Sequence, residues 1–228
     1  IGINAGITNV SLSKSFTTDE KGNRVPCAGE LYYRGYEIHD LIKGFFLDNR
    51  FGFEECTYLL LFGVLPDEKE LQNFKQVLNI SYDLPHHFIQ DVIMKSPTAD
   101  IIANMTKSTL ALGSYDKKMG DNSLENVLQQ CIQLISMFPR LAVYSYQGYR
   151  HYELGKSCYI HKPLPELSFA ENILSTLRSN RKYTRLEARV LDLALVLHME
   201  HGGGSNSTFT TRVVTSSGSD TYATMAVP

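Results

Sequence analysis

The chain has 228 residues, with 22 basic against 24 acidic side chains and a formal net charge of −2. Because the charges balance and no Lys/Arg cluster occurs, the composition argues against a nucleic-acid surface or a basic membrane patch. The longest apolar runs, such as TYLLLFGVL, are far shorter than the ~20 residues of a membrane-spanning helix, and no signal-peptide pattern opens the chain. The four cysteines lack C-x-x-C spacing, which favours thiols in a reducing compartment and predicts a cytoplasmic protein.

The N-terminal region, residues 1–36, predicts a small β-hairpin. ITNVSLSKSF alternates in the manner of a strand, TTDEKGNRV is typical of a turn, and GELYYRG predicts a second short strand.

Residues 37–228 carry helical patterns. Apolar residues recur at helical spacing over residues 51–63, 66–79, 97–116, 123–139, 140–152, 169–179 and 185–201. Gly63 and Pro139 predict helix ends, and Asp67 with Glu70 predicts a capping box. Capping boxes are also predicted at Ser168 with Glu171 and at Thr184 with Glu187. The fold class is therefore mainly α: a multi-helical domain with a small N-terminal hairpin.

The last of these helices, residues 185–201, is apolar nearly all round, which predicts that it is buried. It is expected to run to His201, with Gly202 as its C-terminal cap. Since residues three apart share a helical face, His198 and His201 should be neighbours while Glu200 points elsewhere.

Three readings fit the segment HMEHGGGSNST that ends this helix. Its histidines can simply bond to helix carbonyls, with the glycines demanded by the backbone path. A metal site is disfavoured, because His-x-x-His supplies two ligands where zinc usually takes three or four. An anion site is the third reading, at a following helix capped by Ser207 or Thr208.

The segments LYYRGYEIHDLI, RFGFEECTYLLLFGVLPDEKEL, SPTADIIANMTKSTLALGSYD and LDLALVLHMEHGGGSNSTFTTRVV resemble citrate synthases. The resemblance covers nearly the whole chain in the family's order. The matching segments are most similar to those of bacterial citrate and 2-methylcitrate synthases. It implies that residues 1–228 are part of the family's large helical domain, the N-terminal and central part of the protein. The family's small domain and C-terminal catalytic part are then absent.

The resemblance implies condensation of acetyl-CoA with oxaloacetate to citrate and CoA, a reaction of the tricarboxylic acid cycle. Acetyl-CoA is then a substrate and no bound cofactor or metal is expected. It also implies a homodimer, formed through the segment DIIANMTKSTLALGS with its small residues Ala103, Ser108, Ala111 and Gly113. No nucleic-acid or membrane partner is implied.

By the same resemblance, His201 matches the histidine that contacts oxaloacetate, and Ser207 matches a hydroxyl that supports a catalytic histidine. His198 is given a structural or supporting role, and Ser205 none, because the family often has Asn there.

The family's Gly-Pro-x-His-Gly-Gly-Ala-Asn segment, its general-base Asp and its oxaloacetate arginines have no match in the 228 residues, so no catalytic residue is assigned. We expect the chain alone to be inactive, as a piece of a citrate synthase. The alternative is a shortened, non-catalytic module that dimerises or binds a dicarboxylate.

Overall fold

The computed structural model describes residues 8–80, 83–203 and 205–228, and they form two compact units. Unit 1 is the chain up to Phe74 together with Arg185–Phe209, and unit 2 is Lys75–Thr184 together with Thr210–Pro228. The described residues are mostly helical, so the predicted mainly α class with a small N-terminal hairpin is confirmed. None of the described helices is long and apolar enough to cross a bilayer.

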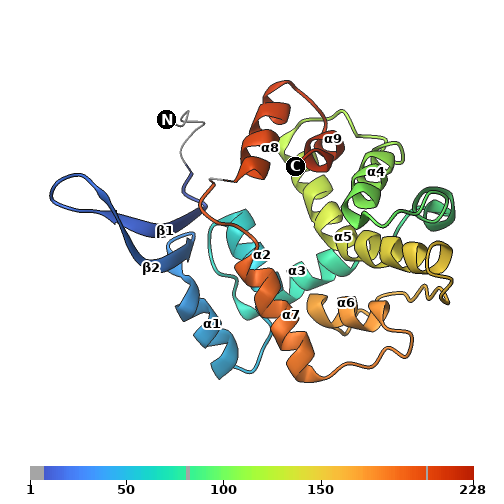
Figure 1. The fold of residues 1–228 in the computed structure, drawn as a ribbon, viewed down its shortest axis with the longest axis horizontal. Coiled ribbons are helices and arrows are strands. Elements are labelled where there is room, and N and C mark those ends of the chain that lie inside the picture. Colours follow the sequence, from blue (N-terminus) through green and yellow to red (C-terminus); the bar gives the residue numbers. More distant parts are fainter. Residues whose placement is uncertain (1–7, 81–82, 204) are drawn as a thin grey trace. The chain divides into compact units, whose positions relative to one another are not determined.

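Unit 1 joins a hairpin to helices. Strands β1 (Ser11–Thr18), β2 (Arg24–Tyr33) and β3 (Tyr36–Glu37) form an antiparallel sheet in that order, and β1 and β2 form the long arm in Figure 1. The helices are α1 (Ile38–Leu47), α2 (Phe53–Phe62), the start of α3 (Glu68–Ile80) and α7 (Arg185–Leu197). Helix α2 contacts both α7 and β2. The buried apolar residues of these elements include Tyr33, Ile38, Leu41, Phe45, Phe53, Cys56, Leu59 and Val196.

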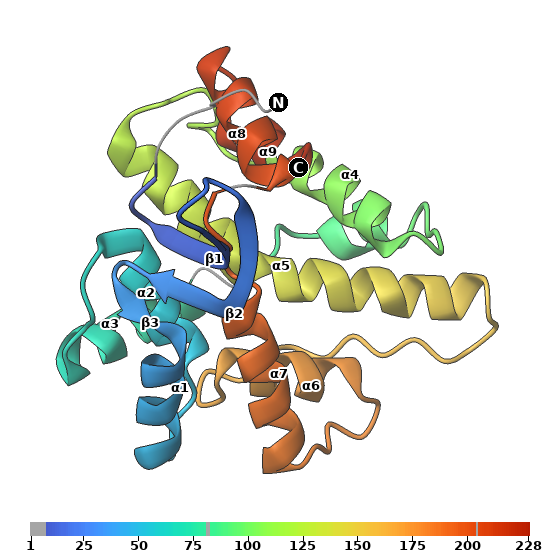
Figure 2. The same cartoon turned by 60° about the vertical axis from the view of Figure 1, so that its left-hand side comes forward.

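Unit 2 is built around one long helix, α5 (Leu124–Tyr152). Its other elements are a short π-helical turn η1 (Ile89–Ile93), α4 (Ile101–Gly113), α6 (Phe169–Leu177), most of α8 (Asn206–Ser216) and α9 (Thr221–Ala226). Helix α5 contacts α4, α6 and α9 (Figures 1 and 2). The core of the unit is one apolar cluster of buried residues: Phe88, Ile93, Leu112, Leu134, Met137, Leu141, Val143, Tyr144 and Tyr222.

The prediction that Pro139 ends a helix is wrong, because α5 runs through it without a break. A proline inside a helix removes one backbone hydrogen bond and costs about 3 kcal/mol. Here the helix buries Met137, Leu141 and Tyr144 around that position, and each fully buried large apolar side chain contributes roughly 1.5–3 kcal/mol. Tertiary burial on both sides of the proline therefore outweighs the local signal.

The prediction that α7 is buried all round is also wrong. Leu186 is 72% exposed and Val190 59% exposed, although both are apolar. The buried residues Ala188, Asp192 and Val196 lie four apart, a spacing that places them on one face of the helix. Only that face is buried.

The predicted helix signals at Gly63, Asp67 and Ser168 are confirmed, and the predicted capping box of Thr184 with Glu187 stays a prediction. Helix α2 ends at Gly63. The main-chain N–H of Glu70 donates to the Asp67 carboxylate at 2.7 Å, and the Asp67 N–H donates back to Glu70 at 2.9 Å. Ser168 and Glu171 form the same reciprocal arrangement at the start of α6. These local motifs act through residues three apart, so the sequence alone is enough to predict them.

Candidate functional site

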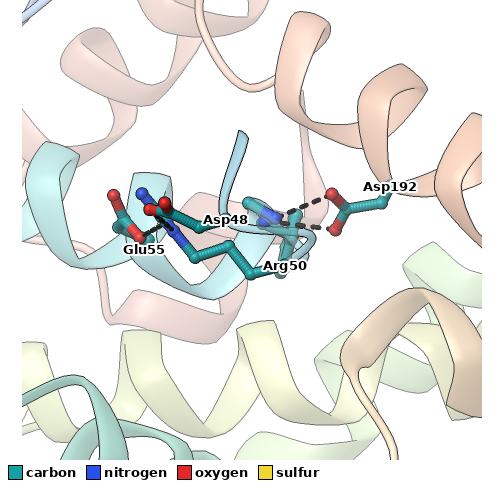
Figure 3. A network of polar contacts seen from close by, with 6 residues as sticks. Asp48, Arg50, Glu55 and Asp192 are labelled. Carbon is teal, nitrogen blue, oxygen red and sulfur yellow. Dashed lines mark hydrogen bonds and ion pairs between the residues drawn. The ribbon is translucent and has the colours of Figure 1, made fainter. Parts of the chain in front are cut away.

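The site begins with the way α7 is fixed to α2. Asp192 on α7 is buried, and its carboxylate accepts hydrogen bonds from the backbone N–H groups of Gly52 (2.7 Å) and Phe53 (3.1 Å). These N–H groups open α2 and have no partner within a helix. A negative charge is also favoured there by the helix dipole. Figure 3 shows Asp192 pointing at this turn. Asp192 therefore sets the position of α7, and with it the segment that follows α7.

Gly52 is required by the close packing of the Phe45 ring of α1 against the start of α2. A Cβ at this position would lie 2.2 Å from a ring carbon of Phe45, so any larger residue would push α1 away from the start of α2. With no side chain at Gly52 to cap α2, the cap comes from Asp192 of a distant helix. Beside it, Arg50 forms ion pairs with Asp48 and Glu55 (Figure 3).

Helix α7 ends at Leu197, before the histidines. The prediction that the helix runs to His201 and that Gly202 caps it is therefore wrong, and His198 and His201 share no helical face. The imidazole Nδ1 of His198 lies 2.6 Å from the carbonyl oxygen of Ala194 and donates to it. His198 is thus engaged by the last turn of α7.

Side chains from three places hold the segment that leaves α7. The Tyr33 hydroxyl donates to the carbonyl oxygens of Val196 (2.7 Å) and Glu200 (3.3 Å). The Glu200 carboxylate accepts from the N–H groups of His201 (2.8 Å) and Gly203 (3.0 Å), both on the same oxygen. The Gly202 N–H donates to the Ser11 hydroxyl at 2.8 Å. Three consecutive backbone N–H groups therefore end on side-chain acceptors.

The glycines of this segment meet two demands at once. Gly202 has φ +90° and Gly203 φ +71°, the left-handed region that glycine adopts without strain. The hairpin also approaches closely: a Cβ on Gly202 would lie 2.8 Å from the backbone nitrogen of Ser13, and one on Gly203 would lie 2.9 Å from the Thr8 methyl carbon. The interpretation that the backbone path demands glycine is confirmed at these two positions.

The electrostatics of the segment follow from the same contacts. Burial raises the pKa of Tyr33 to about 12, so its hydroxyl keeps its proton and stays a donor. Burial also works to raise the pKa of Glu200, but hydrogen bonds from the Gly203 and His201 N–H groups and from Ser11 outweigh it and lower that pKa. Glu200 is therefore an ionised acceptor at neutral pH.

The predicted site residues lie around this anchored segment. The His201 side chain is exposed, directly between Glu200 and Gly202 in the chain. Ser207 is exposed in the first turn of α8. The predicted N-cap at Ser207 or Thr208 is wrong, because the Ser205 hydroxyl accepts from the Thr208 N–H at 3.0 Å and caps the helix two residues earlier. Within the described part of the chain, no hydrogen bond joins His198, His201 and Ser207 to one another.

Sequence reasoning missed the residues that position the segment. It set Glu200 aside as pointing away, because it assumed a helix where the chain has already left one. Asp192 left a signal that was available, a lone carboxylate in the apolar run LDLALVL. Ser11 and Tyr33 left none, because their partners are more than 160 residues away in the sequence.

The chemical group that this segment presents is the exposed imidazole of His201, on a backbone held by hydrogen bonds. An imidazole can donate to, or accept from, a carboxylate or ketone ligand. A cavity of about 310 Å³ opens next to the anchoring hydroxyl, lined by Thr8, Asn9, Ser11, Leu12, Tyr32 and Gly35. Among the described residues, no cluster of three or more His, Cys, Asp or Glu side chains is arranged to hold a metal ion.

Known proteins are similar to this chain in sequence and in fold. The family model for the citrate synthase C-terminal domain matches residues 4–227. The chain is 31% identical to citrate synthase of Saccharolobus solfataricus, over 98% of this chain and 54% of that protein. It is 30% identical to citrate synthase of Heyndrickxia coagulans, over 86% of this chain and 49% of that protein.

Solved structures agree. Citrate synthase from Pyrobaculum aerophilum matches with a TM-score of 0.76 and 26% identity, over 97% of this chain and 51% of that one. Citrate synthase from Thermoplasma acidophilum, solved as a ternary complex with carboxymethyl coenzyme A and oxaloacetate, matches with the same TM-score and identity over 98% and 52%. The chain spans about half the length of these relatives. Since the family model covers nearly all of the 228 residues, the chain belongs to the citrate synthase family.

Proposed function

We propose that this chain binds oxaloacetate through His201 and serves the condensation of oxaloacetate with acetyl-CoA to citrate and CoA. The observation that carries the proposal is the exposed imidazole of His201 on a backbone held by Glu200 and Ser11. The family match and the oxaloacetate complex of the Thermoplasma acidophilum relative support it. In this proposal the chain is part of the family's large domain.

The proposed roles follow from what each group can do. His201 donates a hydrogen bond to the ketone or a carboxylate of oxaloacetate and so stabilises charge that develops there. Ser207 orients a catalytic histidine through its hydroxyl, and His198 supports the segment through its bond to Ala194. The proton transfers of the reaction need a general acid and a general base, and the family's residues for these roles have no counterpart in the 228 residues. The chain alone is therefore proposed to bind oxaloacetate without condensing it with acetyl-CoA.

The test is to measure binding and chemistry separately. Isothermal titration with oxaloacetate should show binding to the 228-residue chain, and His201→Ala should weaken it about tenfold or more, as expected for losing a hydrogen bond to a charged group. His86→Ala, an exposed histidine of unit 2, is the matched control and should leave the affinity unchanged.

A thiol-release assay with acetyl-CoA and oxaloacetate completes the test. The full reading frame that contains this chain should release CoA, and the 228-residue chain should not. Release of CoA by the 228-residue chain alone would overturn the proposal that it binds substrate without catalysing the condensation. Absence of CoA release from both proteins would favour the alternative, a non-catalytic module that dimerises or binds a dicarboxylate. Failure of the chain to bind oxaloacetate would overturn the proposed role of His201.

We also propose a homodimer through α4. Ile102 and Leu110 are 71% and 50% exposed and lie eight residues apart, so they occupy one face of the helix. Of the small residues expected to allow close approach, Ala103 is exposed, whereas Ser108 and Gly113 are buried, Gly113 against Met119 and Tyr222 of its own unit. The exposed apolar face supports the proposal. Because Ser108 and Gly113 are buried within their own unit, the proposed dimer interface is limited to the face of α4 that carries Ile102.

Light scattering after size exclusion tests this surface. The wild type should have the mass of a dimer, and Ile102→Asp with Leu110→Asp should give a monomer, because a charge buried at an interface is costly. Leu154→Asp, at another half-exposed leucine, should remain dimeric. A wild-type monomer at high concentration would contradict the proposal.

A further inference from the structure

We propose that Glu200 is a positioning residue which, with Ser11 and Tyr33, fixes the backbone of His201 and thereby sets the affinity for oxaloacetate. The inference rests on the proposed role of His201 and extends it to residues that do not touch the substrate. Its basis is the pattern of hydrogen bonds around the segment, which we call the His201 clamp: Ser11, Tyr33 and Glu200.

The carboxylate of the clamp binds on both sides of the histidine. One oxygen of Glu200 accepts from the N–H of His201 at 2.8 Å and from the N–H of Gly203 at 3.0 Å. Two backbone N–H groups that converge on one anionic oxygen form the kind of concave site in which backbone binds anions. Here the anion belongs to the chain itself, so the turn at His201 is closed by its own neighbour.

The two hydroxyls of the clamp come from one cross-strand pair. Ser11 on β1 lies opposite Tyr33 on β2 in the register of the hairpin. The Ser11 hydroxyl accepts from Gly202, and the Tyr33 hydroxyl donates to the carbonyl of Glu200. The base of the hairpin therefore holds the N–H and C=O groups on either side of His201.

The glycines explain why a clamp is needed. A glycine-rich segment has more backbone freedom to lose than any other, and it has no side chains of its own to pack. If the segment were free, ordering it would oppose substrate binding, whereas a segment held in advance binds without that cost. The clamp removes the freedom before oxaloacetate arrives.

The decisive comparison is between Glu200→Gln and Glu200→Ala. Both backbone bonds use a single oxygen, and the amide oxygen of Gln can accept both, so Gln keeps the clamp and loses only the charge. Alanine removes the acceptor. We expect Glu200→Ala to weaken oxaloacetate binding about tenfold or more and Glu200→Gln by less than about threefold. Ser11→Ala should weaken binding about threefold, and Ser15→Ala, an exposed serine of the same strand, should have no effect.

Two readouts separate positioning from general stability. Affinities are compared well below the unfolding midpoint of each variant, where every protein is folded, so that a weaker affinity of Glu200→Ala cannot come from unfolded chains. Hydrogen exchange at the His201 and Gly203 amides, measured without ligand, should be faster in Glu200→Ala than in the wild type and rescued in Glu200→Gln.

The outcomes also separate this inference from the proposed function. Equal affinity of the wild type and Glu200→Ala would overturn the positioning role while leaving oxaloacetate binding intact. If the wild type does not bind oxaloacetate, the proposed function fails, and unchanged amide exchange in Glu200→Ala would then overturn the clamp independently.

Discussion

Unit 2 is organised around an apolar cluster on α5, whereas the segment around His201 in unit 1 is organised by polar side chains that bond to backbone groups. In unit 2, Leu141 and Tyr144 lie fully buried in the middle of a long helix. In unit 1, Asp192 caps a distant helix and Glu200 closes a glycine turn. The two regions show how the same chain holds regular and irregular backbone.

The difference has a physical reason. A helix satisfies its own backbone groups, so packing one face is enough to hold it. The segment after α7 satisfies few of its backbone groups internally, and buried or half-buried N–H groups need acceptors from elsewhere. The irregular backbone of this segment is therefore held by specific side chains, two of them from other elements.

The largest effect is expected from removing an aromatic side chain in the core of unit 2. Tyr144→Ala should lower the free energy of unfolding by about 4 kcal/mol, because it leaves a cavity in the apolar cluster. It also removes the hydrogen bond from the Tyr144 hydroxyl to the carbonyl of His161. Urea unfolding measures the change. Tyr146→Ala, partly exposed on the same helix, is the control and should cost less than half as much.

Removing the buried carboxylate of Asp192 in unit 1 should cause the next largest loss of stability. Asp192→Ala should cost about 3 kcal/mol, because the N–H groups of Gly52 and Phe53 lose a charged acceptor in a buried place. Hydrogen exchange by mass spectrometry should show the loss in α2 and α7. Asp40→Ala, an exposed carboxylate of α1, should cost less than about 1 kcal/mol. Equal effects of the two variants would mean that Asp192 does not fix α7.

A single hydroxyl should have a smaller effect. Tyr33→Phe keeps the buried ring and removes the donor to the carbonyls of Val196 and Glu200, so we expect a loss of about 1 kcal/mol. Chemical unfolding of Tyr33→Phe beside Tyr36→Phe, at an exposed tyrosine, measures it. If Tyr33→Phe leaves the free energy of unfolding unchanged, the ring alone holds this end of α7.

The smallest effect is a pH dependence carried by Glu200. Its folded pKa is lowered, so the carboxylate contributes stability above its unfolded pKa, and that contribution disappears as the pH falls through the folded pKa. Stability of the wild type relative to Glu200→Gln should therefore shrink between about pH 7 and about pH 3. Urea midpoints across that range measure it, and a constant difference between the two proteins would contradict the lowered pKa.

Much of the fold could be predicted because its signals are local. Local signals depend on residues a few positions apart, as in the hairpin turn, the end of α2 at Gly63 and the capping boxes at Asp67 and Ser168. The same reasoning failed at Pro139, where burial along α5 outweighs a local break, and at α7, where an apolar composition does not mean burial on every side.

For the proposed site, the sequence by itself determined which residue types are present: a histidine at position 201, glycines after it and hydroxyls beyond them. Those are matters of residue type, which a sequence states directly. Only the tertiary structure decided that α7 stops before His201, that Asp192 fixes α7 to α2, and that Ser11 and Tyr33 reach the glycine turn. Each of these depends on backbone groups meeting side chains far away in the chain, and no local pattern encodes such partners.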